Sequence, residues 1–173
     1  MGPCLRVRYR KCFVTNECMR FRLEGANWVL EFSPAATAVM YANAQTKSSS
    51  AESVGQLYTR DLTTSTVLIE HASLLKPRRA SRGRVQFDPK TAYVERTALF
   101  KQGLHCVGIW HTHPEPYPSP SGEDKVLARD YAVAAKPALT GIVFVIVGTL
   151  PPPDAFKVWV DNGQKLSNAA SVR

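Results

Sequence analysis

Apolar and charged residues alternate strictly near the start of the chain. In CLRVRYR (residues 4–10), Leu5, Val7 and Tyr9 alternate with arginines, which is the period-two pattern of a half-buried strand. The next segment, FRLEGANWVLEF, indicates a hairpin that turns at residues 25–27. Residues 1–32 are therefore predicted to form N-terminal strands.

Three helices are predicted from residues that begin helices well. Ser33 followed by proline is an N-cap with proline in the first turn, and Asp88 followed by proline repeats that arrangement. Gly103 ends the second helix, and Ser121 begins the third. The predicted helices cover residues 34–45, 89–102 and 122–135.

Short apolar segments predict the remaining strands. They are VGQLYTR (54–60), TVLIEHA (66–72), LHCVGIWH (104–111), GIVFVIVG (141–148) and FKVWVDNG (156–163). The last two are expected to finish the sheet, leaving residues 164–173 as a polar tail, and residues 76–84 are expected to form a basic loop. The simplest arrangement is one domain over residues 1–173, of the α/β class, with helices packed on a mixed, largely antiparallel sheet.

Composition narrows the class of protein. The 173 residues, 45% hydrophobic, suit one globular domain. No apolar segment has the length of a membrane span, and no apolar stretch follows the N-terminal charges. The cysteines form no C-x-x-C pair, so we interpret them as reduced thiols of a cytoplasmic protein; they are Cys4, Cys12, Cys18 and Cys106.

The net charge of +8 is concentrated in two basic segments, residues 6–22 and 76–84. Such clusters attract nucleic acid or an acidic partner. A solvated strand face and a solvated loop are the simpler and favoured explanation. We expect no membrane partner, and nucleic acid is the less favoured of the macromolecular partners.

The segment WHTHPEPYPSPSGED (110–124) carries the candidate chemistry. His111 and His113 are two residues apart at the end of a strand, so extended geometry places both side chains on one face, with Cα atoms roughly 6.5–7 Å apart. Asp124, in the first turn of the next helix, offers a third ligand. Two imidazoles and one carboxylate leave one zinc position for water, which is the arrangement of a catalytic site.

Simpler interpretations of the same residues remain open. An H-x-H pair alone is compatible with two surface histidines, and Ser121 with Asp124 also matches an ordinary capping box. Four prolines between the histidines and Ser121 fix φ and lower the entropy cost of ordering the loop. A stiff loop would hold strand-borne and helix-borne ligands at a constant separation.

The complete pattern, His111-Thr112-His113-Pro114 followed by Ser121 and Asp124, resembles the JAMM motif of the MPN-domain zinc metalloproteases. The resemblance covers roughly residues 33–161. It implies a three-layer α/β fold similar to that of the cytidine deaminases. Deaminase activity itself is disfavoured, because the H-x-E and P-C-x-x-C ligands are absent.

The resemblance also implies an upstream glutamate. The stretch AESVGQLYTR is similar to the family's E-x-G-G-x-L-x-G segment, although Val54 replaces one glycine, and it makes Glu52 the candidate. Glu70 and Glu95 are rivals by position, but neither has the following glycine. In the implied mechanism Glu52 is the general base, and Ser121 stabilises the oxyanion. The resemblance implies that His111, His113 and Asp124 bind Zn²⁺.

The resemblance is strongest to bacterial members of the family that accompany ubiquitin-like conjugation operons. It implies an isopeptidase that releases the C-terminus of a ubiquitin-like protein from a target lysine. In CBASS antiphage systems the conjugated protein is a cGAS-like nucleotidyltransferase, and E1-like and E2-like proteins are the operon partners. A RadC-like nucleic-acid-associated protein and a hydrolase of small amides remain alternatives, whereas a scaffold without activity is disfavoured because the motif is complete.

Overall fold

The structure, a computed structural model, describes residues 18–172 as eleven strands and three helices. The helices are α1 (Pro34–Ala42), α2 (Pro89–Phe100) and α3 (Gly122–Ala135). The strands are β1 (Met19–Leu23), β2 (Val29–Phe32), β3 (Val54–Thr59), β4 (Thr66–Ile69), β5 (His71–Ala72), β6 (Pro77–Ser81), β7 (Arg84–Phe87), β8 (His105–Thr112), β9 (Ile142–Val147), β10 (Phe156–Asp161) and β11 (Leu166–Val172).

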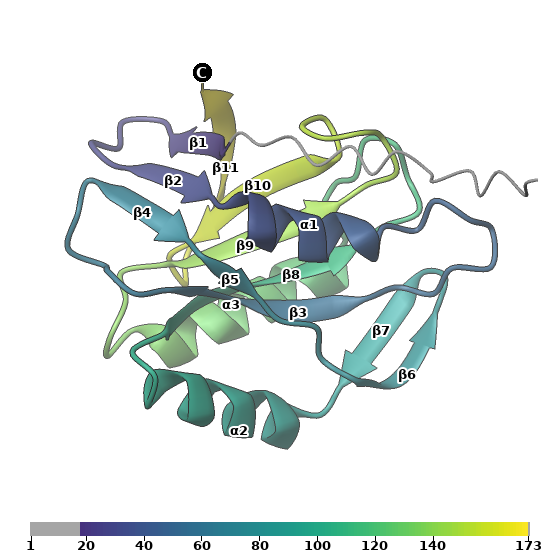
Figure 1. The fold of residues 1–173 in the computed structure, drawn as a ribbon, viewed down its shortest axis with the longest axis horizontal. Helices are drawn as coiled ribbons and strands as arrows, with labels where there is room; N and C mark the ends of the chain where they lie inside the picture. The colour runs from purple at the N-terminus through teal and green to yellow at the C-terminus, as the bar shows by residue number, and fades with distance from the viewer. Residues whose placement is uncertain (1–17, 173) are drawn as a thin grey trace, which may run out of the picture.

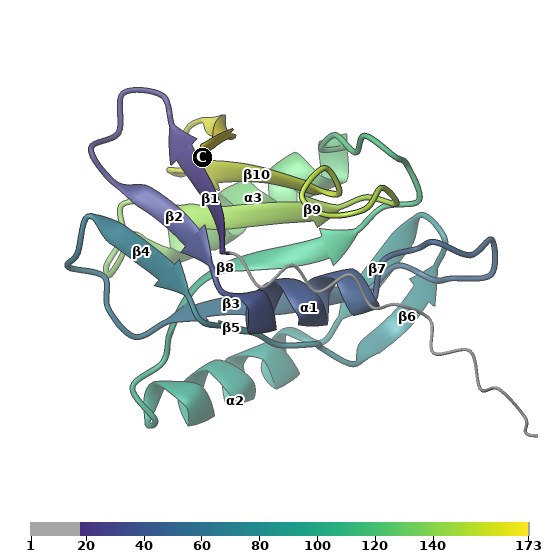
Figure 2. The same ribbon diagram turned by 45° about the horizontal axis from the view of Figure 1, so that its top comes forward.

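One sheet contains nine of these strands, in the order β4-β2-β1-β11-β10-β9-β8-β3-β5. Its pairs are antiparallel except β2–β4 and β8–β9. Helix α1 covers one face of the sheet, and α2 and α3 lie on the other (Figures 1 and 2). The predicted α/β class, with a largely antiparallel sheet between helices, is confirmed.

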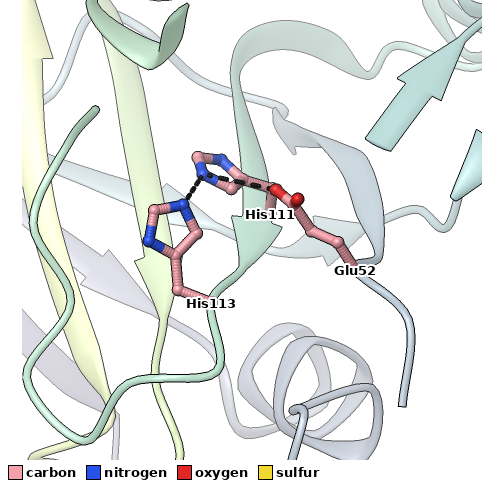
Figure 3. Close-up of side chains that lie close together, drawn as sticks. All are labelled: Glu52, His111 and His113. Carbon is pink, nitrogen blue, oxygen red and sulfur yellow. Dashed lines mark hydrogen bonds and ion pairs between the residues drawn. The ribbon is translucent and has the colours of Figure 1, made fainter. Parts of the chain in front are cut away.

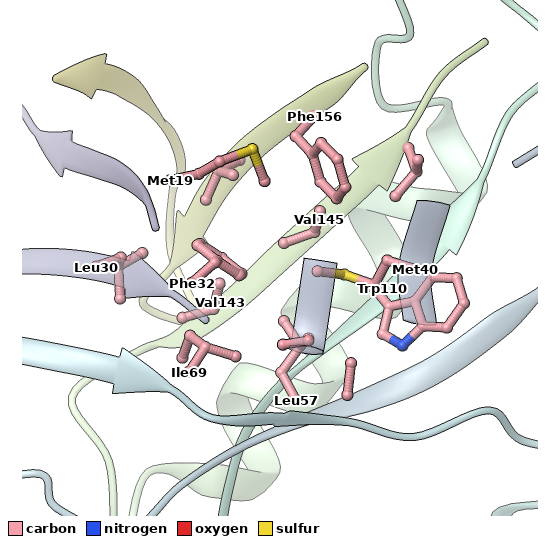
Figure 4. Packing of buried hydrophobic residues seen from close by; sticks show 14 of the residues in the cluster. Met19, Leu30, Phe32, Met40, Leu57, Ile69, Trp110, Val143, Val145 and Phe156 are labelled. Carbon is pink, nitrogen blue, oxygen red and sulfur yellow. The ribbon is translucent and has the colours of Figure 1, made fainter. Parts of the chain in front are cut away.

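Helices on both faces explain the continuous apolar sequence of β9, whose six side chains are all buried. Alternate residues of the strand point to opposite faces. On the α1 side they pack with Met40 and Trp110 (Figure 4). On the α3 side they pack with Ala128 and Ala132. The first set is Val143, Val145 and Val147, and the second is Ile142, Phe144 and Ile146.

The local signals for the hairpin and the helices are confirmed. Strands β1 and β2 pair antiparallel around Gly25, which has a φ of +77°. Each helix begins after its expected N-cap residue, and the side chains of Ser33, Asp88 and Ser121 accept hydrogen bonds from backbone N–H groups of the first turn. The predicted strand at residues 4–10 lies outside the described residues.

The segment 66–72, predicted as one strand, is divided at Glu70. Strand β4 pairs with β2, and β5 pairs with β3 at the opposite edge of the sheet. The N–H of Glu70 donates to the carbonyl oxygen of Tyr58 (3.0 Å), and its own carbonyl accepts from the Ser33 hydroxyl (3.0 Å). The sheet therefore curls until its two edges meet at one residue, which no local pattern can reveal.

Two segments expected to be irregular form strands. Residues 76–84, the expected basic loop, belong to the β6–β7 hairpin, whose Val85 and Phe87 pack against a small core that includes Val54 and Leu75. The expected polar tail forms β11, which lies between β1 and β10. Both predictions fail because the strands are held by backbone pairing and by apolar partners that are distant in the sequence.

Two further expectations concern the thiols and the membrane. Cys18 and Cys106 are both free, as expected, whereas Cys4 and Cys12 lie outside the described residues. None of the helices in residues 18–172 combines the length and apolar character needed to cross a bilayer.

Gly55 marks a close approach between β3 and the chain that follows β5. The indole Nε1 of Trp110 donates to the carbonyl oxygen of Ser73 (2.8 Å), and a Cβ on Gly55 would overlap both atoms. The buried indole therefore requires glycine at this position, next to the segment that carries Glu52.

We predict that Gly55→Ala lowers the free energy of unfolding by about 2–3 kcal/mol, because overpacking strains this core. Urea denaturation monitored by circular dichroism measures the effect. Gly122→Ala is the matched control, since nothing lies within 4 Å of a Cβ built on Gly122. Equal stabilities of the two variants would contradict the close approach.

Candidate metal centre

The two histidines of the motif meet at the end of strand β8. His111 lies within the strand, and His113 follows its last residue, with the His113 N–H still donating to the carbonyl oxygen of Val147 (2.9 Å). Because the backbone stays extended, both rings lie on one face, and their Nε2 atoms are 2.9 Å apart (Figure 3). His111 is buried and His113 partly buried.

Asp124 reaches the same point from helix α3. Its Oδ1 lies 3.2 Å from Nε2 of His111, and its Oδ2 lies 3.4 Å from Nε2 of His113. The same Oδ2 accepts a hydrogen bond from the backbone N–H of Ser121 (2.7 Å), while the Ser121 hydroxyl accepts from the N–H of Asp124 (3.2 Å). The capping box is thus present, and it aims the carboxylate at the histidines.

Glu52 approaches the pair from the residues before β3. Its Oε1 lies 3.7 Å from Nε2 of His111, and the side chain is buried (Figure 3). The backbone N–H of Glu52 donates to the carbonyl oxygen of Ser81 (2.8 Å), so the β6–β7 hairpin helps to hold it. Burial raises the pKa of Glu52 to about 7, although the charge of His113 opposes the shift.

A hydrogen-bonded network fixes the glutamate relative to the histidines. Thr112 donates its N–H to the carbonyl oxygen of Ser53 (3.0 Å), and the N–H of Ser53 donates to the Thr112 hydroxyl (2.9 Å). That hydroxyl donates in turn to the buried Gln45 side chain (3.2 Å), whose amide donates to the carbonyl oxygen of Arg82 (2.7 Å). The position of Thr112 between two histidines is a local signal for this role, but nothing local marks Gln45.

The rival glutamates are engaged elsewhere. Glu70 pairs with Arg60 at 3.3 Å, and Glu95 accepts hydrogen bonds from the Tyr58 hydroxyl (2.7 Å) and from the amide of Gln56 (2.9 Å). In the described residues, the ligand atoms of Glu52, His111 and His113 all lie within 4.8 Å of one another, so this cluster contains Glu52 and neither rival.

Glu115, in the loop between β8 and α3, contacts the outer nitrogen of the His113 ring. Its carboxylate lies 3.1 Å from Nδ1 of His113, and such a partner fixes the tautomer that leaves Nε2 free to bind a metal. No local pattern in the sequence indicates this role.

The protonation states of His111 and Asp124 suit metal binding. Burial lowers the pKa of His111, which keeps this imidazole neutral. For Asp124, burial acts to raise the pKa, but the hydrogen bonds from His111 and His113 lower it far below its usual range. For His113, burial lowers the pKa, and the hydrogen bond and charge of Asp124 more than compensate. The cluster thus presents a neutral imidazole beside a carboxylate that stays charged.

The separations between donor atoms also fit a small divalent ion. A tetrahedral zinc ion with ligands at about 2.0–2.1 Å separates its donor atoms by roughly 3.3 Å. The two Nε2 atoms are 2.9 Å apart, and those of His111 and His113 lie 3.2 and 3.4 Å from Oδ1 and Oδ2 of Asp124, respectively. The three side chains are therefore close enough to share one ion.

The cluster lies in an open cleft of about 620 Å³. One wall is the β6–β7 hairpin, which contributes Arg78, Arg84 and Phe87, and the other includes Glu115, Ser121 and Glu123. Ser121 is exposed to this cleft. The cleft therefore connects the histidines to solvent.

Comparisons with known proteins agree with this architecture. The chain is similar to the solution structure of protein DSY2949 from Desulfitobacterium hafniense, with a TM-score of 0.55 and 21% identity, over 79% of this chain and 85% of that one; this likeness is one of fold. No curated protein matches the chain. The family described as prokaryotic homologs of the JAB domain matches residues 9–161. Because that match spans most of the sequence, the chain belongs to the prokaryotic homologs of the JAB domain.

Proposed function

We propose that the protein is a zinc-dependent hydrolase of amide bonds. One observation carries the proposal: two imidazoles and one carboxylate converge on a single point inside an open cleft, with the buried Glu52 beside them. His111, His113 and Asp124 would hold Zn²⁺. A bound zinc ion supplies Lewis acidity and lowers the pKa of water toward neutrality.

The chain's own side chains then divide the remaining work. Glu52 takes a proton from the attacking water and delivers it to the leaving amine. The Ser121 hydroxyl accepts a hydrogen bond from the backbone N–H of Asp124 and is exposed to the cleft, so its proton is free to donate to the carbonyl oxygen as negative charge develops. Glu115 holds the His113 ring in place.

The finer proposal concerns the substrate. We infer that it is an isopeptide bond between the C-terminus of a ubiquitin-like protein and a target lysine, in a CBASS-like conjugation system where the conjugated protein is a cGAS-like nucleotidyltransferase. The completeness of the motif supports this inference, as does the open cleft, which admits an extended polypeptide. E1-like and E2-like proteins would be the partners, in the cytoplasm.

A hydrolase of small amides is the second candidate, because a cleft of about 620 Å³ is also the size of a small-molecule site. Incubating the zinc-loaded protein with a ubiquitin-like fusion and with short acyl-amide substrates separates the two. Cleavage of the short amides alone would end the isopeptidase proposal.

We predict about one zinc ion per chain in freshly purified or reconstituted protein, and we expect His113→Ala to lose it, because two remaining ligands bind zinc weakly. Elemental analysis measures the stoichiometry. His71→Ala, at an exposed histidine outside the cluster, is the control and retains the ion. Wild-type protein that stays free of zinc after reconstitution would rule out the proposed centre.

We predict that Glu52→Gln retains zinc and folding stability while hydrolysis falls by about 10²–10⁴-fold, since the amide cannot accept a proton. Initial rates on the fusion substrate, together with zinc content, test this. Glu70→Gln and Glu95→Gln serve as controls and keep their activity. Full turnover by Glu52→Gln would assign the proton transfer to another group.

We predict that Ser121→Ala loses about 10²–10³-fold in kcat, because it removes a donor to the oxyanion. It also removes a helix cap, which costs about 1 kcal/mol. Ser33→Ala, which uncaps α1 and lies outside the lining of the cleft, loses at least as much stability but little rate. Equal rates for the two variants at a temperature where both are folded would reduce Ser121 to a capping residue.

A further inference from the structure

We infer that the β6–β7 hairpin selects the substrate by charge, and that it accepts an acidic polypeptide segment next to the scissile amide. The inference rests on the proposed function, because it assigns a substrate class to the same cleft. Its basis is a dense set of positive charges on one wall of that cleft.

The hairpin carries far more positive than negative charge. Residues 76–88 contain five basic side chains and one acidic side chain, Asp88. Every residue of β6 is exposed. Like charges crowded on a two-stranded hairpin repel one another, so an anionic ligand would relieve a repulsion already present. The basic residues are Lys76, Arg78, Arg79, Arg82 and Arg84.

This charge is held at a fixed place beside the histidines. The carbonyl oxygens of Ser81 and Arg82 accept hydrogen bonds from the backbone of Glu52 (2.8 Å) and from the side chain of Gln45 (2.7 Å). The Arg82 guanidinium donates to the carbonyl oxygens of residues 47 and 48 at 3.0 and 2.9 Å. The hairpin is therefore tied to the segment that carries the proposed base.

Two arginines face the cleft, and their present partners are easily exchanged. Arg84 pairs with Glu123 at 3.3 Å, and Arg78 pairs with Asp88 at 3.2 Å. Both arginines line the cleft together with His111. Their guanidinium groups are well exposed, so each pair contributes little to stability. Carboxylates of a substrate can replace Glu123 and Asp88 at small cost.

The opposite wall favours a polypeptide over a nucleic acid. Glu115 and Glu123 line that wall, and Glu52 and Asp124 lie at its base. A continuous phosphate backbone would meet these carboxylates wherever it left the hairpin. An acidic segment of a polypeptide can be confined to one wall.

The experiment uses the zinc-loaded full chain and three peptide substrates with the same scissile amide. The three residues beside the amide are acidic (Asp and Glu), their neutral amides (Asn and Gln), or lysine. We expect kcat/KM for the acidic substrate to exceed that of the neutral one by about tenfold, and that of the lysine substrate by more. The acidic-to-neutral ratio of kcat/KM should decrease between about 50 mM and about 300 mM salt, because screening weakens the interactions between exposed charges.

Three variants test the assignment to the hairpin. Arg84→Gln and Arg78→Gln should each lower the acidic-to-neutral ratio several-fold. Glu123→Gln should raise it, because it removes the carboxylate that competes for Arg84. Arg129→Gln, at an exposed arginine of α3 that does not line the cleft, should leave the ratio unchanged. The opposite signs at Arg84 and Glu123 separate charge selection from a general loss of fold.

Equal kcat/KM values for the three substrates, or a ratio that Arg84→Gln leaves unchanged, would overturn the inference while leaving the proposed hydrolase intact. If no substrate is cleaved, the proposed function fails, and fluorescence anisotropy of the labelled peptides still tests the hairpin. Tighter binding of the acidic peptide, weakened by Arg84→Gln, would support it. A single-stranded oligonucleotide that displaces the acidic peptide at lower concentration than unlabelled peptide would overturn it in favour of nucleic acid.

Discussion

The geometry of the site depends on how the beginning of β3 pairs with the end of β8. Val54 lies opposite His111, and beyond this pair Thr112 and Ser53 hold each other through two hydrogen bonds, one of them to the threonine hydroxyl. A slip of one residue in this register would turn the buried side chains to the wrong face. The register therefore brings Glu52 to the two histidines, although 58 residues separate it from the nearer one.

The protein environment shifts the pKa values of the two buried carboxylates of the site in opposite directions. Asp124 lies between two imidazoles and accepts a backbone hydrogen bond, and its pKa falls as a result of these contacts. The carboxylate of Glu52 lies 3.7 Å from His111, and burial raises its pKa to about 7. The two side chains carry the same functional group, but Asp124 stays charged whereas Glu52 can gain a proton. One site therefore holds both a permanent anion and a proton acceptor.

The features predicted correctly from local sequence are those that depend on interactions between neighbouring residues. The N-caps, the H-x-H spacing and the capping box at Ser121 depend on neighbouring residues, and they appear at the expected positions. Glu52 was identified only through a family resemblance, because the pairing that brings it to His111 is long-range. The β6–β7 hairpin, the division at Glu70 and the role of Gln45 also depend on distant partners, so no local pattern contains them.

The strand order has a consequence for how the molecule is assembled. Strand β11 (Leu166–Val172) lies between β1 and β10, so within the strand order of the sheet β1 reaches β10 through the last strand of the described chain. During synthesis, β1 and β2 must wait for almost the entire chain to leave the ribosome before this junction can close. The order of translation therefore delays completion of this part of the sheet, and loss of β11 would leave the facing edges of β1 and β10 without the strand that pairs with both.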